Sequence, residues 1–119
     1  MPNRTPASIR IRVRVTCGAA DAFGPGKAQL LESLLETGSL NRTASAMKMS
    51  YVKALALVRA MNENFREPLV ELSRGGANGG GTQVTAAGRR ALEQYHTMRE
   101  ASEAATRPAW RKLRKLLKT

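Results

Sequence analysis

The residues that enzymes and metal sites use are scarce in this chain of 119 residues. His96 is the single histidine, and with Glu100 it forms an i, i+4 pair on a predicted helix. Cys17 is the single cysteine and Asp21 the single aspartate. One histidine and one cysteine cannot supply the three or four protein ligands of an ordinary zinc site. Asp21 has no carboxylate partner at a spacing typical of acid and base catalysis. We therefore expect no enzyme activity, no metal site and no cofactor.

Two glycine-containing stretches invite comparison with phosphate-binding loops of nucleotide-binding proteins, and both fail it. Gly26-Lys27 is followed by Ala28, where the loop needs Ser or Thr, and Asp21 stands where its first glycine belongs. The run 75–81 contains no lysine and leads into a predicted strand, not a helix. Two interpretations of this run stay open: a solvated hairpin tip, or a tip whose backbone N–H groups approach phosphates.

Net charge is the unusual feature of the composition, with 20 Lys and Arg against 9 Asp and Glu, or +11. Such a balance suits a polyanionic partner, either nucleic acid or an anionic membrane surface. The single cysteine excludes an intrachain disulfide and fits a reducing compartment. The N-terminus lacks a signal-peptide pattern, and no run approaches the roughly 18 apolar residues of a membrane span. We expect a cytoplasmic protein that does not span a membrane.

Hydrophobic periodicity divides the chain into a flexible tail at 1–8, a folded domain at 9–106 and a basic amphipathic helix at 107–119. Residues 9–15 alternate β-branched and arginine side chains, which predicts a half-buried strand. Its arginines either face solvent or contact phosphates. Pro108 is expected to break or restart the helix before it. In 107–119, Trp110 and three leucines oppose six cations. This apolar face packs on the protein or a second copy, or lies on a membrane surface.

Three short helices are predicted in the middle of the domain. Leucines recur at helical spacing in 27–37, after an expected turn at 24–26, and Gly38 is placed for a left-handed C-cap. Ser39 and Ser50 can N-cap two further helices that follow closely. Two short helices joined by a tight connection are typical of a helix-turn-helix, whose second helix enters the major groove of DNA.

The helix that begins after Ser50 presents two contrasting faces. Ala54, Val58 and Met61 form an inward stripe, whereas Val52 and Leu55 are predicted on the outward side. Apolar groups left in water there indicate a contact surface, for which thymine methyl groups are one partner. The residues predicted to contact base edges are Tyr51, Val52, Lys53 and Leu55. Those predicted to position the protein on phosphates are Arg42, Lys48 and Arg74, and Arg59 also projects from this helix.

A hairpin and a long helix complete the domain. Residues 69–74 and 82–85 are predicted strands joined by the glycine run, and Thr85 can N-cap a fourth helix. Taken in order, the segments Gly38-Ser-Leu, Ser50-Tyr51, the glycine-rich tip and Thr85-x-x-Gly88 resemble the DNA-binding domain of ModE-type molybdate-responsive regulators. That domain is related to the LysR-type winged helix, and the resemblance covers about residues 9–102.

The resemblance implies a mainly α fold with a small β-sheet, a winged helix-turn-helix. In this fold the N-terminal strand joins the wing strands and the long fourth helix serves dimerisation. It also implies a transcriptional regulator that acts as a homodimer on palindromic double-stranded DNA. The positions that match the family's recognition helix are Ser50, Tyr51, Val52, Lys53 and Leu55, and those that match its wing are Arg74 and Asn78.

Two departures limit what the resemblance implies. Family members carry a β-rich molybdate-binding region after the fourth helix, whereas this sequence ends at Thr119 in a basic helix. Sensing of molybdate or another effector is therefore not implied. Relatives often place an aromatic residue where Leu55 stands, so their operator sequence is not transferred. The residues also leave open a non-specific architectural DNA-binding protein, and an adaptor that binds a membrane surface through 107–119.

Overall fold

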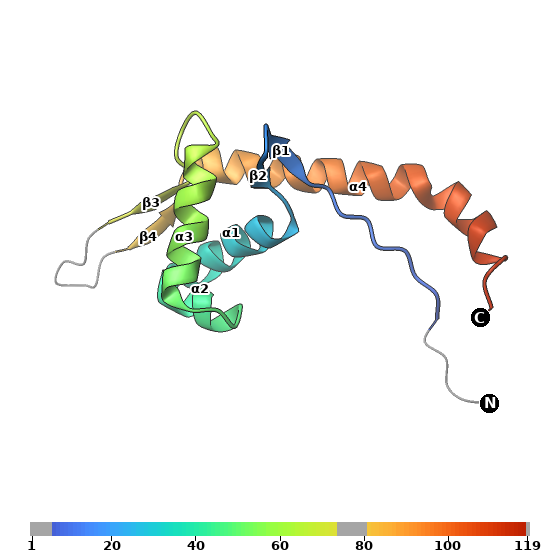
Figure 1. Cartoon of the computed structure of the whole chain (residues 1–119), viewed down its shortest axis with the longest axis horizontal. Helices are drawn as coiled ribbons and strands as arrows, with labels where there is room; N and C mark the ends of the chain where they lie inside the picture. Colours follow the sequence, from blue (N-terminus) through green and yellow to red (C-terminus); the bar gives the residue numbers. More distant parts are fainter. Residues whose placement is uncertain (1–5, 74–80, 119) are drawn as a thin grey trace.

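A computed structural model describes residues 6–73 and 81–118. The elements in chain order are β1 (Val15–Cys17), β2 (Ala20–Phe23), α1 (Pro25–Thr37), α2 (Leu40–Ala46), α3 (Tyr51–Glu63), β3 (Val70–Leu72), β4 (Thr82–Val84) and α4 (Ala86–Arg114). In Figure 1, α1 lies against the N-terminal half of α4, α2 lies on the far side of α1 beside α3, and β3 and β4 project together as a wing. The prediction of a mainly α winged helix-turn-helix is confirmed.

The molecule is elongated because α4 extends beyond the packed domain. Its radius of gyration is 18.0 Å and its extents are 59 × 35 × 24 Å, whereas a compact domain of this length has a radius near 13.5 Å. The 29 residues of α4 span about 43 Å at the α-helical rise. Figure 1 shows its C-terminal half running past the other helices, beside the chain segment that precedes β1.

Local capping fixes where the short helices begin and end. Gly38 adopts the left-handed conformation (φ 66°) at the C-cap of α1, as predicted. The side chain of Ser39 accepts a hydrogen bond from the backbone N–H of Arg42, and that of Ser50 accepts one from Lys53. Both predicted N-caps are confirmed. The turn expected at 24–26 is wrong, since Pro25 is the first residue of α1, a position where proline's missing N–H costs nothing.

The β-structure differs from the prediction. Two separate two-stranded antiparallel sheets are present in the described residues, β1 with β2 and β3 with β4. The N-terminal strand therefore does not join the wing strands. The strand predicted over 9–15 is also wrong, because only Val15–Cys17 pairs, with Ala20–Phe23 after a turn at Gly18. Alternation alone cannot make a strand without a partner, and β2 is too short to pair further.

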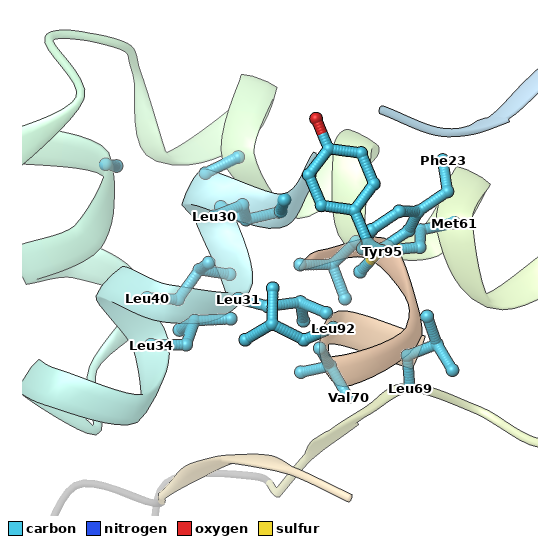
Figure 2. Packing of buried hydrophobic residues seen from close by; sticks show 14 residues of the cluster. Phe23, Leu30, Leu31, Leu34, Leu40, Met61, Leu69, Val70, Leu92 and Tyr95 are labelled. Carbon is cyan, nitrogen blue, oxygen red and sulfur yellow. The ribbon is translucent and has the colours of Figure 1, made fainter. Parts of the chain in front are cut away.

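The hydrophobic core lies where α1, α3, the wing base and α4 meet. Figure 2 shows Leu30, Leu31 and Leu34 of α1 facing Leu92 and Tyr95 of α4, with Met61 of α3, Leu69 and Val70 beside them. The Phe23 ring packs edge-on against Tyr95 at 5.4 Å and Phe65 at 6.1 Å between centroids. Burying each leucine contributes about 2 kcal/mol. The core therefore ties the helix-turn-helix to α4.

Helix α4 continues through Pro108 to Arg114, so the predicted break there is wrong. Proline removes one backbone hydrogen bond and kinks a helix, but the rest of the ladder persists around it. Figure 1 shows α4 bending in this C-terminal part. The segment expected as a separate helix from residue 107 is thus the end of α4. The tail expected at 1–8 has no regular structure over 6–8, and 1–5 lie outside the described residues.

Candidate nucleic-acid interface

The connection between α2 and α3 is a tight turn held by backbone hydrogen bonds. The N–H of Met49 donates to the carbonyl of Ala44 at 2.9 Å, and that of Lys48 to Ser45 at 3.1 Å. Lys48 has φ 56°, and in the described residues it is the one non-glycine with a positive φ. Its side chain is exposed at the corner of the helix-turn-helix. The strained corner therefore carries a cation, where glycine would be easier to accommodate.

Helix α3 has a buried face and a solvent face along its whole length. Ala54, Val58 and Met61 are fully buried, as predicted. On the other side Val52 is 75% exposed and Tyr51 46% exposed, and Lys53 and Arg59 are exposed as well. Ala56 also lies on this solvent face. The outward face thus mixes cations with small apolar groups, a combination that suits both phosphates and base edges.

Leu55 does not belong to the outward face. It is half-buried and packs against the core cluster. Residues three apart lie on neighbouring helix faces, so Leu55 falls beside the buried Val58 and not opposite it. The prediction of an outward Leu55 is therefore wrong, whereas Tyr51, Val52 and Lys53 are exposed as expected.

Four predicted cationic contacts come together around α2 and α3. Arg42, Lys48, Lys53 and Arg59 are all exposed. Within residues 6–73 and 81–118 the ion pairs are Arg14–Asp21, Arg90–Glu67 and His96–Glu32, so none of the four pairs with a described carboxylate. Their charges remain available to a polyanion.

The wing is anchored to α3 by a residue whose role sequence reasoning missed. The side chain of Asn62 donates to the carbonyl of Val70 and accepts from the N–H groups of Leu69 and Val70, at 2.9 to 3.2 Å. No periodicity marks such a residue, because its partners are seven and eight positions away on another element. Arg74 and Asn78, the predicted wing contacts, lie outside the described residues.

The predicted cap of α4 is confirmed and does more than cap. The Thr85 hydroxyl accepts from the N–H of Gly88 at 3.0 Å and donates to the carbonyl of Pro68 at 2.7 Å. Its own N–H donates to the carbonyl of Leu69. Thr85 therefore connects the end of β4 and the start of α4 to the segment that leads from α3 into β3. Ser50 likewise has its side-chain oxygen engaged as a cap.

The described residues contain no group of three or more His, Cys, Asp or Glu side chains arranged to hold a metal ion. His96 Nε2 lies 3.0 Å from Glu32 Oε1, so it links α4 to α1. None of the described helices is long and apolar enough to cross a bilayer.

Comparison with known proteins identifies relatives of this chain. The transcriptional regulator ModE of Haemophilus influenzae is 37% identical over 81 residues, which cover 68% of this chain and 32% of the relative. The molybdenum transport protein ModE of Azotobacter vinelandii is 34% identical over 94 residues, 79% of this chain and 35% of the relative. No family model matches the chain.

This chain is a ModE-type DNA-binding domain. The DNA-binding transcriptional dual regulator ModE of Escherichia coli K12 is a further relative, 30% identical over 68% of this chain and 31% of its own length. The ModE-type domain spans about a third of the length of the curated relatives it matches. The capped helix-turn-helix and the wing described above are the architecture that the resemblance implied.

Proposed function

We propose that this chain is the DNA-binding part of a sequence-specific transcriptional regulator, with α3 as the helix that enters the major groove. The observation that carries the proposal is the outward face of α3, where Val52, Lys53 and Arg59 are exposed beside exposed cations of α2 and the turn. The names of the relatives support the same function. Because α3 begins at a capped, exposed N-terminus, its first turns can approach base edges.

Each exposed residue has a distinct role in this proposal. Arg42 and Lys48 flank α2 and the turn, and they contact phosphates on either side of the groove. Tyr51, Val52 and Lys53 lie over the first turn of α3 and contact base edges. Leu55 packs against the core beneath this surface. Ser50 caps the helix, and Arg74 and Asn78 are proposed wing contacts.

We further propose a homodimer on a palindromic operator. An apolar hollow of about 560 Å³ opens beside α4, lined by Phe23, Phe65 and Tyr95 among others. Met98 at its edge is 41% exposed. Leu113 near the end of α4 and Leu117 just beyond it are also exposed. A second copy whose α4 lies against this face would cover these apolar groups, which a monomer leaves in water.

The decisive experiment is in vitro selection, in which the whole chain binds duplexes from a random pool at one fixed salt concentration. The expected product is an inverted repeat whose half-sites lie about 34 Å apart, one helical turn. Affinity for it should exceed that for random DNA by at least about 10³. If the selection enriches no common sequence, specific recognition is overturned and non-specific architectural binding is favoured. A motif without two-fold symmetry would overturn the dimer alone. A cytoplasmic location belongs to the same proposal.

A further inference from the structure

A second hollow, of about 360 Å³, lies on the flank of α3. It is bounded by the β1–β2 hairpin, the start of α1, the turn before α3 and the first half of α3. Lys53 and Leu57 line it and stand four residues apart, so both lie on one side of α3. The hollow therefore borders the outward face of α3.

Three cations from separate parts of the chain line this hollow. Arg14 precedes β1, Lys27 lies in the first turn of α1 and Lys53 in that of α3. They stand against one carboxylate, that of Asp21, which lies 3.5 Å from Arg14. Lys27 Nζ donates to the backbone carbonyl of Asp21, which leaves the Asp21 carboxylate to Arg14. Three positive charges against one negative charge leave the hollow cationic.

The start of α1 adds to the positive potential. Its N-cap, Gly24, provides no side-chain hydrogen bond, and its first turn contains no acidic residue. Helix N-termini carry partial positive charge and N–H groups without intrahelical partners. Residues 24–27 line the hollow, so the positive end of α1 lies at its edge beside the three cations. Gly26-Lys27 does not match a phosphate-binding loop, but the fold places Lys27 beside the same hollow as Arg14 and Lys53.

We propose that this hollow binds one backbone phosphate of the DNA strand beside the α3 footprint, with Lys27 and Arg14 as its contacts. The inference rests on the proposed function. The occupant is a DNA phosphate because the hollow is continuous with the face of α3 that meets the groove. The Arg14 side chain is 60% exposed, so an approaching duplex reaches it directly. Asp21 opposes this phosphate by charge and competes with it for Arg14.

Because Asp21 competes with the phosphate, substitution of Asp21 and substitution of the cations should change DNA affinity in opposite directions. The logarithm of the DNA-binding constant falls linearly with the logarithm of the salt concentration. Lys27→Gln and Arg14→Gln should each make this slope less steep by about 0.9, the value expected for one lost phosphate contact. Asp21→Asn removes the competing carboxylate and keeps the backbone carbonyl that holds Lys27. It should therefore tighten DNA binding. The matched control is Lys112→Gln, which removes one charge from the far end of α4.

The contact can be located with the DNA as well. Each phosphate in the selected half-site is replaced in turn by a neutral methylphosphonate. One replacement should weaken binding of the unmodified protein and leave binding of the Lys27→Gln variant unchanged. The proposal is overturned if Lys27→Gln and the unmodified protein show the same salt dependence of DNA binding and Asp21→Asn does not raise DNA affinity.

Two further measurements separate this inference from its alternatives. If Arg42→Gln lowers the salt slope and Lys27→Gln does not, the proposed function stands and the hollow is not part of the interface. If neither variant changes the slope, the proposed function itself fails. Titration of inorganic phosphate into the DNA-free protein tests whether the hollow binds a free oxyanion instead of a DNA phosphate. Saturable shifts of the Gly24, Gly26 and Lys27 amides, with unchanged DNA binding by Lys27→Gln, would assign the hollow to that anion and overturn the DNA contact.

Discussion

Asn62 near the end of α3 and Val70 at the start of β3 exchange two hydrogen bonds. Asn62 Nδ2 donates to the Val70 carbonyl at 3.0 Å, and the Val70 N–H donates to Asn62 Oδ1 at 3.2 Å. The N–H of Leu69 donates to the same Oδ1 at 2.9 Å. One side chain therefore fixes the base of the wing relative to the helix proposed to enter the major groove. In the proposed complex with DNA, Asn62 would set the position of the wing relative to α3.

Asn62→Ala should lower the free energy of unfolding by about 2 to 4 kcal/mol, because it leaves the backbone groups of two buried residues without partners. Urea denaturation followed by circular dichroism measures this loss. Asn62→Asp keeps the acceptor for both N–H groups but replaces the donor with an oxygen that faces the Val70 carbonyl, so it should recover only part of the loss. Equal stability of Asn62→Ala and the unmodified protein would show that the network contributes nothing.

Gly88→Ala should destabilise the fold although alanine is the better helix former. A Cβ at this position would overlap the carbonyl oxygen of Leu69 and lie 2.7 Å from Val84 Cγ1. Overpacking of this kind costs about 1 to 3 kcal/mol, more than the gain of up to about 1 kcal/mol from helix propensity. Thermal unfolding measures the difference.

The matched control is Gly26→Ala in the first turn of α1. A Cβ there meets nothing within 4 Å, so this variant should be stabilised by up to about 1 kcal/mol. A stabilised Gly88→Ala variant would show that the start of α4 can move away from the wing base.

Lys48→Gly should separate stability from DNA binding. Glycine relieves the left-handed strain at φ 56°, worth about 1 to 2 kcal/mol, and the larger entropy of the unfolded chain offsets part of this gain. Stability should therefore stay equal or rise by up to about 1 kcal/mol, while DNA affinity falls with the lost cation. Denaturation and fluorescence anisotropy measure the two effects. Lys48→Asn is the control, since asparagine also tolerates this conformation. Unchanged affinity in both variants would remove Lys48 from the interface.

Lys53→Ala should weaken binding to the selected operator by about 1 to 3 kcal/mol if its ammonium group contacts a base edge. Binding to random DNA should fall less, because base contacts carry the specificity. Competition between operator and random duplexes measures both. Lys115→Ala, on the exposed end of α4, controls for the loss of one charge. If Lys53→Ala leaves both affinities unchanged, the assignment of α3 as the recognition helix is wrong.

Leu113→Gln combined with Leu117→Gln should weaken dimerisation and leave the fold of the monomer intact. Both side chains are largely in solvent within one chain, 53% and 44% exposed, so their removal breaks no core packing. Sedimentation velocity should show a shift from dimer to monomer, with an unchanged circular dichroism spectrum. The control is Leu116→Gln, three residues after Leu113 and next to Leu117, at a side chain that is 80% exposed. A dimer that persists in the double variant would place the interface elsewhere.

The sequence by itself determined the features that local hydrogen bonds decide. Ser39, Ser50 and Thr85 cap helices through N–H groups three residues ahead, and Gly38 ends α1 because it accepts a left-handed conformation. The buried stripe of α3 follows from helical spacing alone. Such interactions lie within one or two turns, so residue type and spacing specify them.

Only the tertiary structure decided the features that depend on distant partners. The alternating segment 9–15 pairs only at its end because β2 provides no longer partner. Leu55 is half-buried because other elements pack against that flank of α3. The contact of Asn62 with the wing, and the hollow that Lys27 and Lys53 both line, depend on residues from separate elements. Periodicity records which face of an element is apolar, but not which element covers it, and that information arises only when the chain packs.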